Sequence, residues 1–165
     1  MDDELVAFCR REHRRLVAAL ELVCGSLPLA EDLAQETFAR VCKDWSRIRA
    51  MDSPVGYAHR IGLNLARSSF RRRALERRTN ARLGGDDIWN DPDGANAVAV
   101  RAALRALREN QRRVLVMRYF LGYSVAETAE VLSMPVGSVK THAARGLATL
   151  RDLLGTPMTV GDLHA

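Results

Sequence analysis

Several features are scarce in this chain of 165 residues, and each scarcity argues against a class of protein. Aromatic residues make up only 5% of the sequence, which argues against a large β-sandwich. No run approaches the roughly 18 apolar residues that a membrane-spanning helix needs. The first residues are acidic and lack the apolar stretch of a secretory signal. We therefore expect a cytoplasmic protein that makes no membrane contact.

Metal-binding and catalytic patterns are also missing. The three cysteines, Cys9, Cys24 and Cys42, are an odd number without CxxC spacing, and the four histidines are scattered. A zinc site would need clustered thiols and imidazoles. We predict no metal and no cofactor, and interpret the cysteines as small buried apolar residues in a reducing compartment. The absence of a Gly-rich phosphate loop or nucleophile motif leaves no catalytic residue to assign and no small-molecule substrate to expect.

What the chain does have is segregated charge. The net charge is +5, yet residues 60–82 hold eight arginines against one glutamate, a local +7. Residues 84–97 hold four aspartates and no base, and residues 99–151 hold nine bases against three acids, a local +6. Residues 1–50 are close to neutral, with eight basic and nine acidic side chains. Two basic blocks around an acidic stretch predict a polyanionic partner contacted at two places.

Apolar spacing predicts helices throughout and no strand. We expect an all-α chain of two small helical domains, residues 1–78 and 98–155, joined by an acidic flexible linker at 79–97 and followed by a tail at 156–165. Breaks and caps place helices at about 3–24, 30–48, 54–78, 98–107, 110–121, 124–132 and 136–153. The third helix is expected to begin at Pro54 after a Ser53 cap, and its expected inward positions are Val55, Ala58, Ile61, Leu65 and Phe70.

Residues 124–145 show the most specific spacing. Two short helices joined by a tight turn form a helix-turn-helix, whose second helix enters the major groove. A small Ala129 permits close helix approach, while Leu132, Val136 and Val139 are expected to close a small core. Donors at helical spacing on the other face suit phosphates and base edges: Ser138, Lys140, Thr141, His142 and Arg145. An ordinary helical hairpin with solvated polar side chains is the alternative.

Three segments resemble one family. Residues 119–150, YFLGYSVAETAEVLSMPVGSVKTHAARGLATL, resemble the carboxy-terminal domain of bacterial RNA polymerase sigma factors. Residues 30–38, AEDLAQETF, resemble the family's polymerase-binding helix. Residues 53–67, followed by three consecutive arginines, resemble its promoter-melting helix. The short form with these two domains resembles the extracytoplasmic-function (ECF) group of the sigma-70 family.

The resemblance implies a function and a set of site residues. A sigma subunit directs core polymerase to promoters and is not an enzyme. The first domain would read the −10 promoter element through Arg60, Asn64, Arg67, Arg71 and Arg72, with the Asn64 amide facing a flipped base and the arginines holding phosphates. The five donors of the helix-turn-helix would read the −35 element.

The resemblance also implies that a large subunit of the polymerase is bound by four residues of the second helix: Asp32, Gln35, Glu36 and Phe38. Phe38 also lies on the apolar stripe, so its ring could either anchor the polymerase or pack in the core. The three polar residues could equally be ordinary residues of a first helical turn, with no partner. The linker is either a connector that mimics a transcript or a soluble tether. An anti-sigma partner is left open.

Several residues depart from the family pattern. Tyr57 stands where Trp is common, Thr128 where Ile or Leu is usually buried, and Ser133 where a turn glycine is frequent. His142 and Gly146 also depart from the pattern, so the resemblance does not indicate which −35 DNA sequence this helix reads.

The alternative function is that of a stand-alone helix-turn-helix transcriptional regulator. Such a regulator would have no need of the 30–38 helix or of Asn64 within an arginine cluster.

Overall fold

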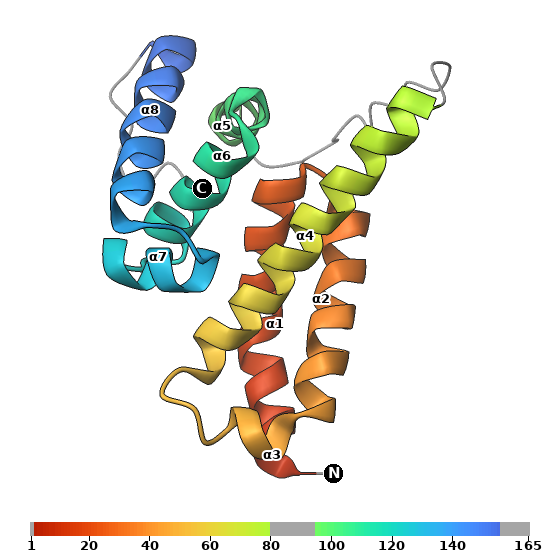
Figure 1. Ribbon diagram of the computed structural model, residues 1–165. Coiled ribbons are helices and arrows are strands. Elements are labelled where there is room, and N and C mark those ends of the chain that lie inside the picture. Colours follow the sequence, from red (N-terminus) through yellow and green to blue (C-terminus); the bar gives the residue numbers. More distant parts are fainter. Residues whose placement is uncertain (1, 80–94, 156–165) are drawn as a thin grey trace. The chain divides into compact units, whose positions relative to one another are not determined.

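The computed structural model in Figure 1 describes residues 2–79 and 95–155. The chain divides into two compact units, residues 1–89 and 90–165, each with its own buried apolar residues. The described parts contain helices and no strand, which confirms the all-α prediction. Most of the predicted acidic flexible linker, and the whole predicted tail, lie outside the described residues.

Two kinds of feature are absent from residues 2–79 and 95–155. No helix there is long and apolar enough to cross a membrane. No group of three or more His, Cys, Asp or Glu side chains in those residues is arranged to hold a metal ion.

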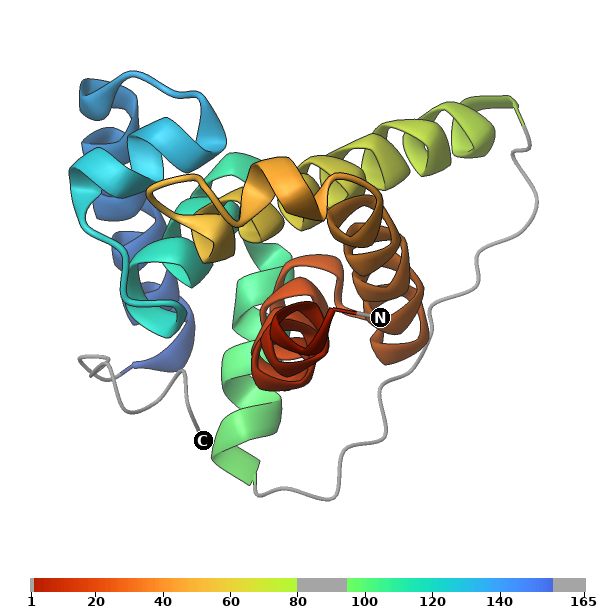
Figure 2. The ribbon, with the colours of Figure 1, turned by 90° about the horizontal axis from the view of Figure 1, so that it is seen from below.

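Three long helices form the first unit. α1 (Asp3–Cys24), α2 (Leu27–Lys43) and α4 (Pro54–Thr79) pack against one another, and the short α3 (Trp45–Ile48) follows α2. Figures 1 and 2 both show α4 crossing α1 and α2, with its C-terminal end extending beyond them. Arg71 and Arg72, on this part of α4, are exposed.

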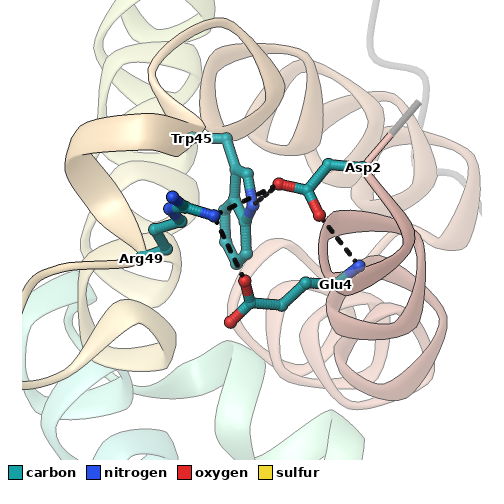
Figure 3. A network of polar contacts seen from close by, with 4 residues as sticks. All are labelled: Asp2, Glu4, Trp45 and Arg49. Atoms are coloured by element: carbon teal, nitrogen blue, oxygen red, sulfur yellow. Dashed lines mark hydrogen bonds and ion pairs between the residues drawn. The ribbon is translucent and has the colours of Figure 1, made fainter.

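The N-terminus of α1 is tied to α3 by a polar network, shown in Figure 3. Asp2 caps α1 by accepting a hydrogen bond from the Glu4 backbone N–H at 3.0 Å, and it also accepts one from Trp45 Nε1 at 3.1 Å. Arg49 lies 3.6 Å from both the Asp2 and Glu4 carboxylates. Below this network the Trp45 ring packs against Phe8, with centroids 5.1 Å apart. Asp2 and Glu4 are therefore both engaged within the unit.

Helix limits in the first unit follow the sequence prediction in part. α1 has its predicted limits and ends at Gly25 in the left-handed conformation. The predicted start of α2 near residue 30 is wrong: the helix begins at Leu27 after a Ser26 cap, because proline is tolerated in a first turn, where its missing N–H has no helical partner. The single helix expected through residue 48 divides at Asp44.

The inner face of α4 differs from the predicted one. Only Ala58 of the five expected inward positions is fully buried; the other four are half-buried. The buried stripe instead combines one large apolar residue, Leu63, with small and polar ones: Gly56, Ala58, His59, Gly62, Ala66 and Ser69. A Cβ at Gly62 would lie 3.1 Å from Leu16 Cδ1 and 3.2 Å from Thr37 Oγ1, so α4 approaches α1 and α2 closely there. The close crossing favours small side chains, which a search for large apolar residues overlooks.

The cysteines are less buried than expected. Cys42 is exposed, and Cys9 and Cys24 are half-buried, so their interpretation as buried apolar residues is wrong. Burial, with a smaller contribution from the neighbouring Cys42 thiol, raises the pKa of the Cys9 thiol to about 11. Cys9 is therefore a protonated thiol near neutral pH.

The second unit is built from shorter helices. They are α5 (Ala95–Ala106), α6 (Glu109–Leu115), the π-helix η1 (Val116–Phe120), α7 (Val125–Leu132) and α8 (Val136–Leu154). The helix expected over 110–121 therefore changes to a wider π-turn at its second half. α6 packs along α8, and a Cβ at Gly146 would lie 2.9 Å from Leu115 Cδ1, so glycine permits that contact.

Two arginines of the second basic block lie inside the unit. Arg113 is 0% exposed, and its Nη1 donates to Asn110 Oδ1 at 3.4 Å. Arg112 is also buried and donates to the Leu104 and Arg105 carbonyls at 3.4 and 3.3 Å. The local charge of +6 counted along the sequence therefore overstates the basic surface of this unit.

Candidate nucleic-acid and polymerase interfaces

The first candidate surface is the outer face of α4. Arg60, Asn64, Arg67 and Arg71 are all exposed and stand at steps of four, three and four residues, so they form one stripe along the helix. Arg72, also exposed, lies beside the stripe with its Nε 3.8 Å from the Glu76 carboxylate. A single amide within a row of cations can hydrogen-bond one unstacked base while the cations hold the flanking phosphates.

The stripe faces outward because the other face of α4 is buried. His59, beside Arg60 in the chain, is only 1% exposed, and burial lowers its pKa to about 4. It is therefore neutral near pH 7 and adds no charge to the surface. The Ser53 hydroxyl accepts a hydrogen bond from the Gly56 N–H at 3.0 Å, as the sequence predicted, so the direction of α4 is set from its first turn.

A contact between α3 and α4 was not visible in the sequence. Arg47 donates to the Tyr57 hydroxyl at 3.0 Å, and its guanidinium lies 5.4 Å from the centre of the Tyr57 ring. The two residues are ten positions apart and lie on different helices, so helical spacing gives no signal for the pair. The contact joins the short α3 to the start of the candidate DNA-reading helix.

The second candidate surface is the polar face of α2. Asp32, Gln35 and Glu36 are exposed and share a face, and Glu36 lies 2.8 Å from Arg40 in an ion pair. Phe38 does not join them. Its side chain is 8% exposed, and the ring stacks on His13 with centroids 5.9 Å apart. The structure therefore favours the core interpretation of Phe38 over that of an exposed anchor.

The third candidate surface is the helix-turn-helix formed by α7 and α8. Ser124 and Glu127 form the predicted capping box, with reciprocal hydrogen bonds of 3.1 and 2.7 Å. These bonds to Ser124 lower the pKa of the Glu127 carboxyl, which keeps it ionised near pH 7. Ser133 ends α7 with φ at +52°, a left-handed conformation that glycine adopts more easily.

The core between α7 and α8 matches the prediction except at one position. Ala129, Leu132 and Val139 are buried, whereas Val136 is 45% exposed, so its predicted core role is wrong. Val136 is the first residue of α8. Its three-residue spacing from Val139 suggested a shared inward face, but the Val136 side chain lies at the surface. Thr128 is fully buried, and its hydroxyl has no hydrogen-bond partner among the described residues.

The outer face of α8 presents part of the predicted donor set. Lys140, Thr141 and Arg145 are exposed, whereas Ser138 and His142 are half-buried at the sides of the helix. The Thr141 hydroxyl donates to the Gly137 carbonyl at 2.9 Å, so its oxygen is left mainly as an acceptor. The two exposed cations, Lys140 and Arg145, are therefore the strongest donors that this face offers.

Comparison with known families assigns these two units. Residues 8–76 match Sigma-70 region 2, and residues 97–150 match Sigma-70, region 4. The chain belongs to the sigma-70 family of RNA polymerase sigma factors. Region 2 thus covers most of α1 and the helices through most of α4, and region 4 covers α5 through most of α8.

Curated relatives place the chain within the ECF group of this sigma-70 family. It is 31% identical over 150 residues to the ECF RNA polymerase sigma factor SigM of Mycobacterium tuberculosis, covering 88% of this chain and 74% of SigM. It is 30% identical over 135 residues to the ECF RNA polymerase sigma factor SigX of Bacillus subtilis, covering 73% of this chain and 68% of SigX.

A solved sigma factor shares the fold. The sigma factor RpoE from Bartonella quintana, in complex with the anti-sigma factor NepR, superposes with a TM-score of 0.80 at 19% sequence identity. The match covers 94% of this chain and 97% of that one. At this identity the likeness concerns the helical fold and not individual residues.

Proposed function

We propose that this sigma-70 family chain binds core RNA polymerase and directs it to promoters, with no catalysis of its own. In this proposal residues 1–78 form sigma domain 2, residues 79–97 the linker, residues 98–155 sigma domain 4 and residues 156–165 a tail. Its place of action is the cytoplasm, where bacterial transcription occurs. The observation that carries the proposal is the exposed Asn64 within the arginine stripe of α4, in a chain that matches both sigma-70 regions.

Each surface has one role in this proposal. The α4 stripe of Arg60, Asn64, Arg67, Arg71 and Arg72 reads the −10 element. On α8, Lys140 and Arg145 carry most of the −35 contact, with Ser138, Thr141 and His142 supporting them. On α2, Asp32, Gln35 and Glu36 meet a large subunit of the polymerase, and Phe38 supports that helix from the core. An anti-sigma factor is a further proposed partner, since the solved RpoE is bound to NepR.

Transcription in vitro with purified core polymerase and a randomised promoter library tests the proposal. We expect run-off RNA that depends on this chain, from templates sharing two short sequence elements. The double variant Asp32→Ala/Gln35→Ala should lower polymerase capture and RNA yield, whereas Glu31→Ala, which removes an exposed acid of the same turn, should leave both near wild type. Specific duplex binding by the chain alone, without polymerase-dependent RNA, would support the stand-alone regulator instead.

A further inference from the structure

The outer face of α1 is more basic than its sequence count suggests. Four arginines, at positions 10, 11, 14 and 15, are exposed in the middle of the helix. The one acid among them, Glu12, is only 7% exposed, and Arg11 Nε lies 2.7 Å from its carboxylate. Glu21, further along the helix, is also buried. The exposed charge in this stretch is therefore all positive.

The acids that balance these arginines in the sequence lie elsewhere. Asp2 and Glu4, at the start of α1, contact Arg49, and Asp2 also contacts Trp45 (Figure 3). Asp3 is exposed in the first turn of α1, two turns before the arginines, and the remaining acids of the first fifty residues follow α1 along the chain, on α2 and at Asp44. Residues 1–50 are thus neutral as a sum, yet they carry an exposed basic patch, defined here as Arg10, Arg11, Arg14 and Arg15.

The helix that carries this patch packs against the helix that carries the α4 stripe. α1 packs directly on α4, and Gly62 of α4 lies against Leu16 and Leu20 of α1. One turn earlier, the charge of Arg15 acts on His59, the residue that precedes Arg60 in the stripe. The α1 patch therefore belongs to a helix that packs against the helix carrying the stripe, in the same unit.

The chemistry of the patch suits phosphates. Arginine guanidinium groups bind phosphate oxygens with paired N–H donors, and rows of them neutralise the closely spaced charges of a nucleic-acid backbone. Arg11 is partly engaged, since it pairs with Glu12 and lies 5.7 Å from the centre of the Phe8 ring. Arg10 and Arg14 are one helical turn apart on the same side, so they are the members best placed to contact successive charges.

We propose that the α1 patch binds backbone phosphates of promoter DNA next to the segment read by α4. The proposal rests on the sigma-factor function above and adds a third helix to the DNA-binding surface. It assigns to α1 an affinity role without sequence readout, because phosphate contacts position the protein and do not discriminate bases. The competing occupant, an acidic surface of the polymerase, is an outcome of the test.

The test measures binding of reconstituted holoenzyme to a forked −10 promoter DNA across a salt series. Arg14→Ala and Arg10→Ala/Arg14→Ala are compared with Lys43→Ala, which removes one exposed cation from α2. We expect the slope of log affinity against log salt to fall by about one for each arginine removed, with equal losses on several promoter sequences. Lys43→Ala should leave the slope unchanged, and holoenzyme assembly, measured separately, should be normal for every variant.

Two results would overturn the proposal. An unchanged slope for the double variant, with assembly intact, would mean that the patch does not contact DNA. A loss confined to holoenzyme assembly would place the patch against polymerase. A photo-crosslinking residue at position 14 gives an independent readout, since a DNA adduct supports the proposal and a polymerase adduct contradicts it. Failure of the wild-type chain to form a promoter-binding holoenzyme would instead reject the sigma-factor function itself.

Discussion

The arginines of α4 and those of α6 show how differently one residue type is used in the two units. On α4 the cations stand in an exposed row, and the helix is held in place by glycine, alanine and serine on its inner side. On α6, Arg112 and Arg113 are buried: Arg112 donates to two backbone carbonyls, and Arg113 donates to an asparagine side chain. The first unit therefore gains charged surface from its arginines, while the second uses two of them as internal scaffolding. A charge count along the chain treats the two cases alike.

The largest expected effect tests this contrast directly. Arg113→Ala should destabilise the second unit by about 3 kcal/mol, because truncating this fully buried side chain leaves a cavity and takes a donor away from Asn110. Arg67→Ala, on the exposed stripe, should change stability by no more than about 0.5 kcal/mol. Urea unfolding followed by amide NMR resolves the two units. Equal stability losses for the two variants would contradict the distinction between buried arginines in the second unit and surface arginines on α4.

The inner side of α4 is expected to make the first unit sensitive to pH. Burial lowers the pKa of His59 to about 4, below the value of about 6.5 in an unfolded chain. The unfolded state therefore binds the proton more readily, and stability is lost as pH falls from about 6.5 to about 4. The loss should be on the order of 3 kcal/mol at full protonation.

Urea titrations at several pH values measure this loss. His59→Gln should flatten the pH dependence. A pH dependence unchanged by His59→Gln would mean that another group titrates.

In the second unit, the exposed Arg145 should behave like a base-reading residue. Arg145→Ala should cost about 1–3 kcal/mol at one position of the −35 element and relax its sequence preference, because a bidentate contact to guanine is lost. Binding to a library of −35 variants measures this. An equal loss on every sequence would make Arg145 a phosphate contact, like the arginines proposed on α4.

Within the α4 stripe, Asn64 should differ from the cations on either side. Asn64→Ala should lower promoter opening about tenfold, the effect of losing roughly 1.4 kcal/mol of hydrogen bonding to an unstacked base. Initial closed-complex binding should change little. Permanganate reactivity of the bubble reports opening, and Ser68→Ala, one turn further along the exposed surface, is the matched control. Normal reactivity for Asn64→Ala would reduce the stripe to a phosphate-binding surface.

The smallest expected effect concerns the turn that directs α8. Ser133 has a φ of +52°, so Ser133→Gly should relieve left-handed strain and stabilise the second unit by up to about 1 kcal/mol. Ser124→Gly is the control with the opposite expected sign. It removes the hydrogen bond from the Glu127 N–H to the Ser124 hydroxyl and should destabilise the second unit. Thermal unfolding of both variants measures the pair, and a destabilising Ser133→Gly would show that the serine side chain supports the turn.

Local chemistry predicted much of the fold. The limits of α1, the Ser53 cap of α4 and the Ser124–Glu127 capping box depend on residues within one turn, and all three are as expected. The start of α2 and the π-turn after Leu115 were missed, because a proline in a first turn and an extra residue in a helical turn leave no clear periodic signal.

Some predictions of which side chains are buried were correct and others were wrong. Arg145 is exposed, as the helical spacing of the donors indicated, and Asn64 and Arg67 are exposed, which agrees with the surface role that the family resemblance implied. Val136 and the inward face of α4 were misplaced, since the buried side of a helix depends on where its neighbours cross it. The same dependence explains why Phe38 could be assigned to the core only when its burial was visible.

By itself, the sequence determined the all-α class, most helix limits and the motifs of the two sigma-70 regions, because caps, turns and apolar periods act over a few residues. Only the tertiary structure decided which arginines form surface and which form core. Burial of Arg113 and exposure of Arg14 depend on helices far away in the chain. The separation of charge within the neutral first fifty residues is likewise a tertiary property, since it arises when Glu12 turns inward and Asp2 and Glu4 reach Arg49.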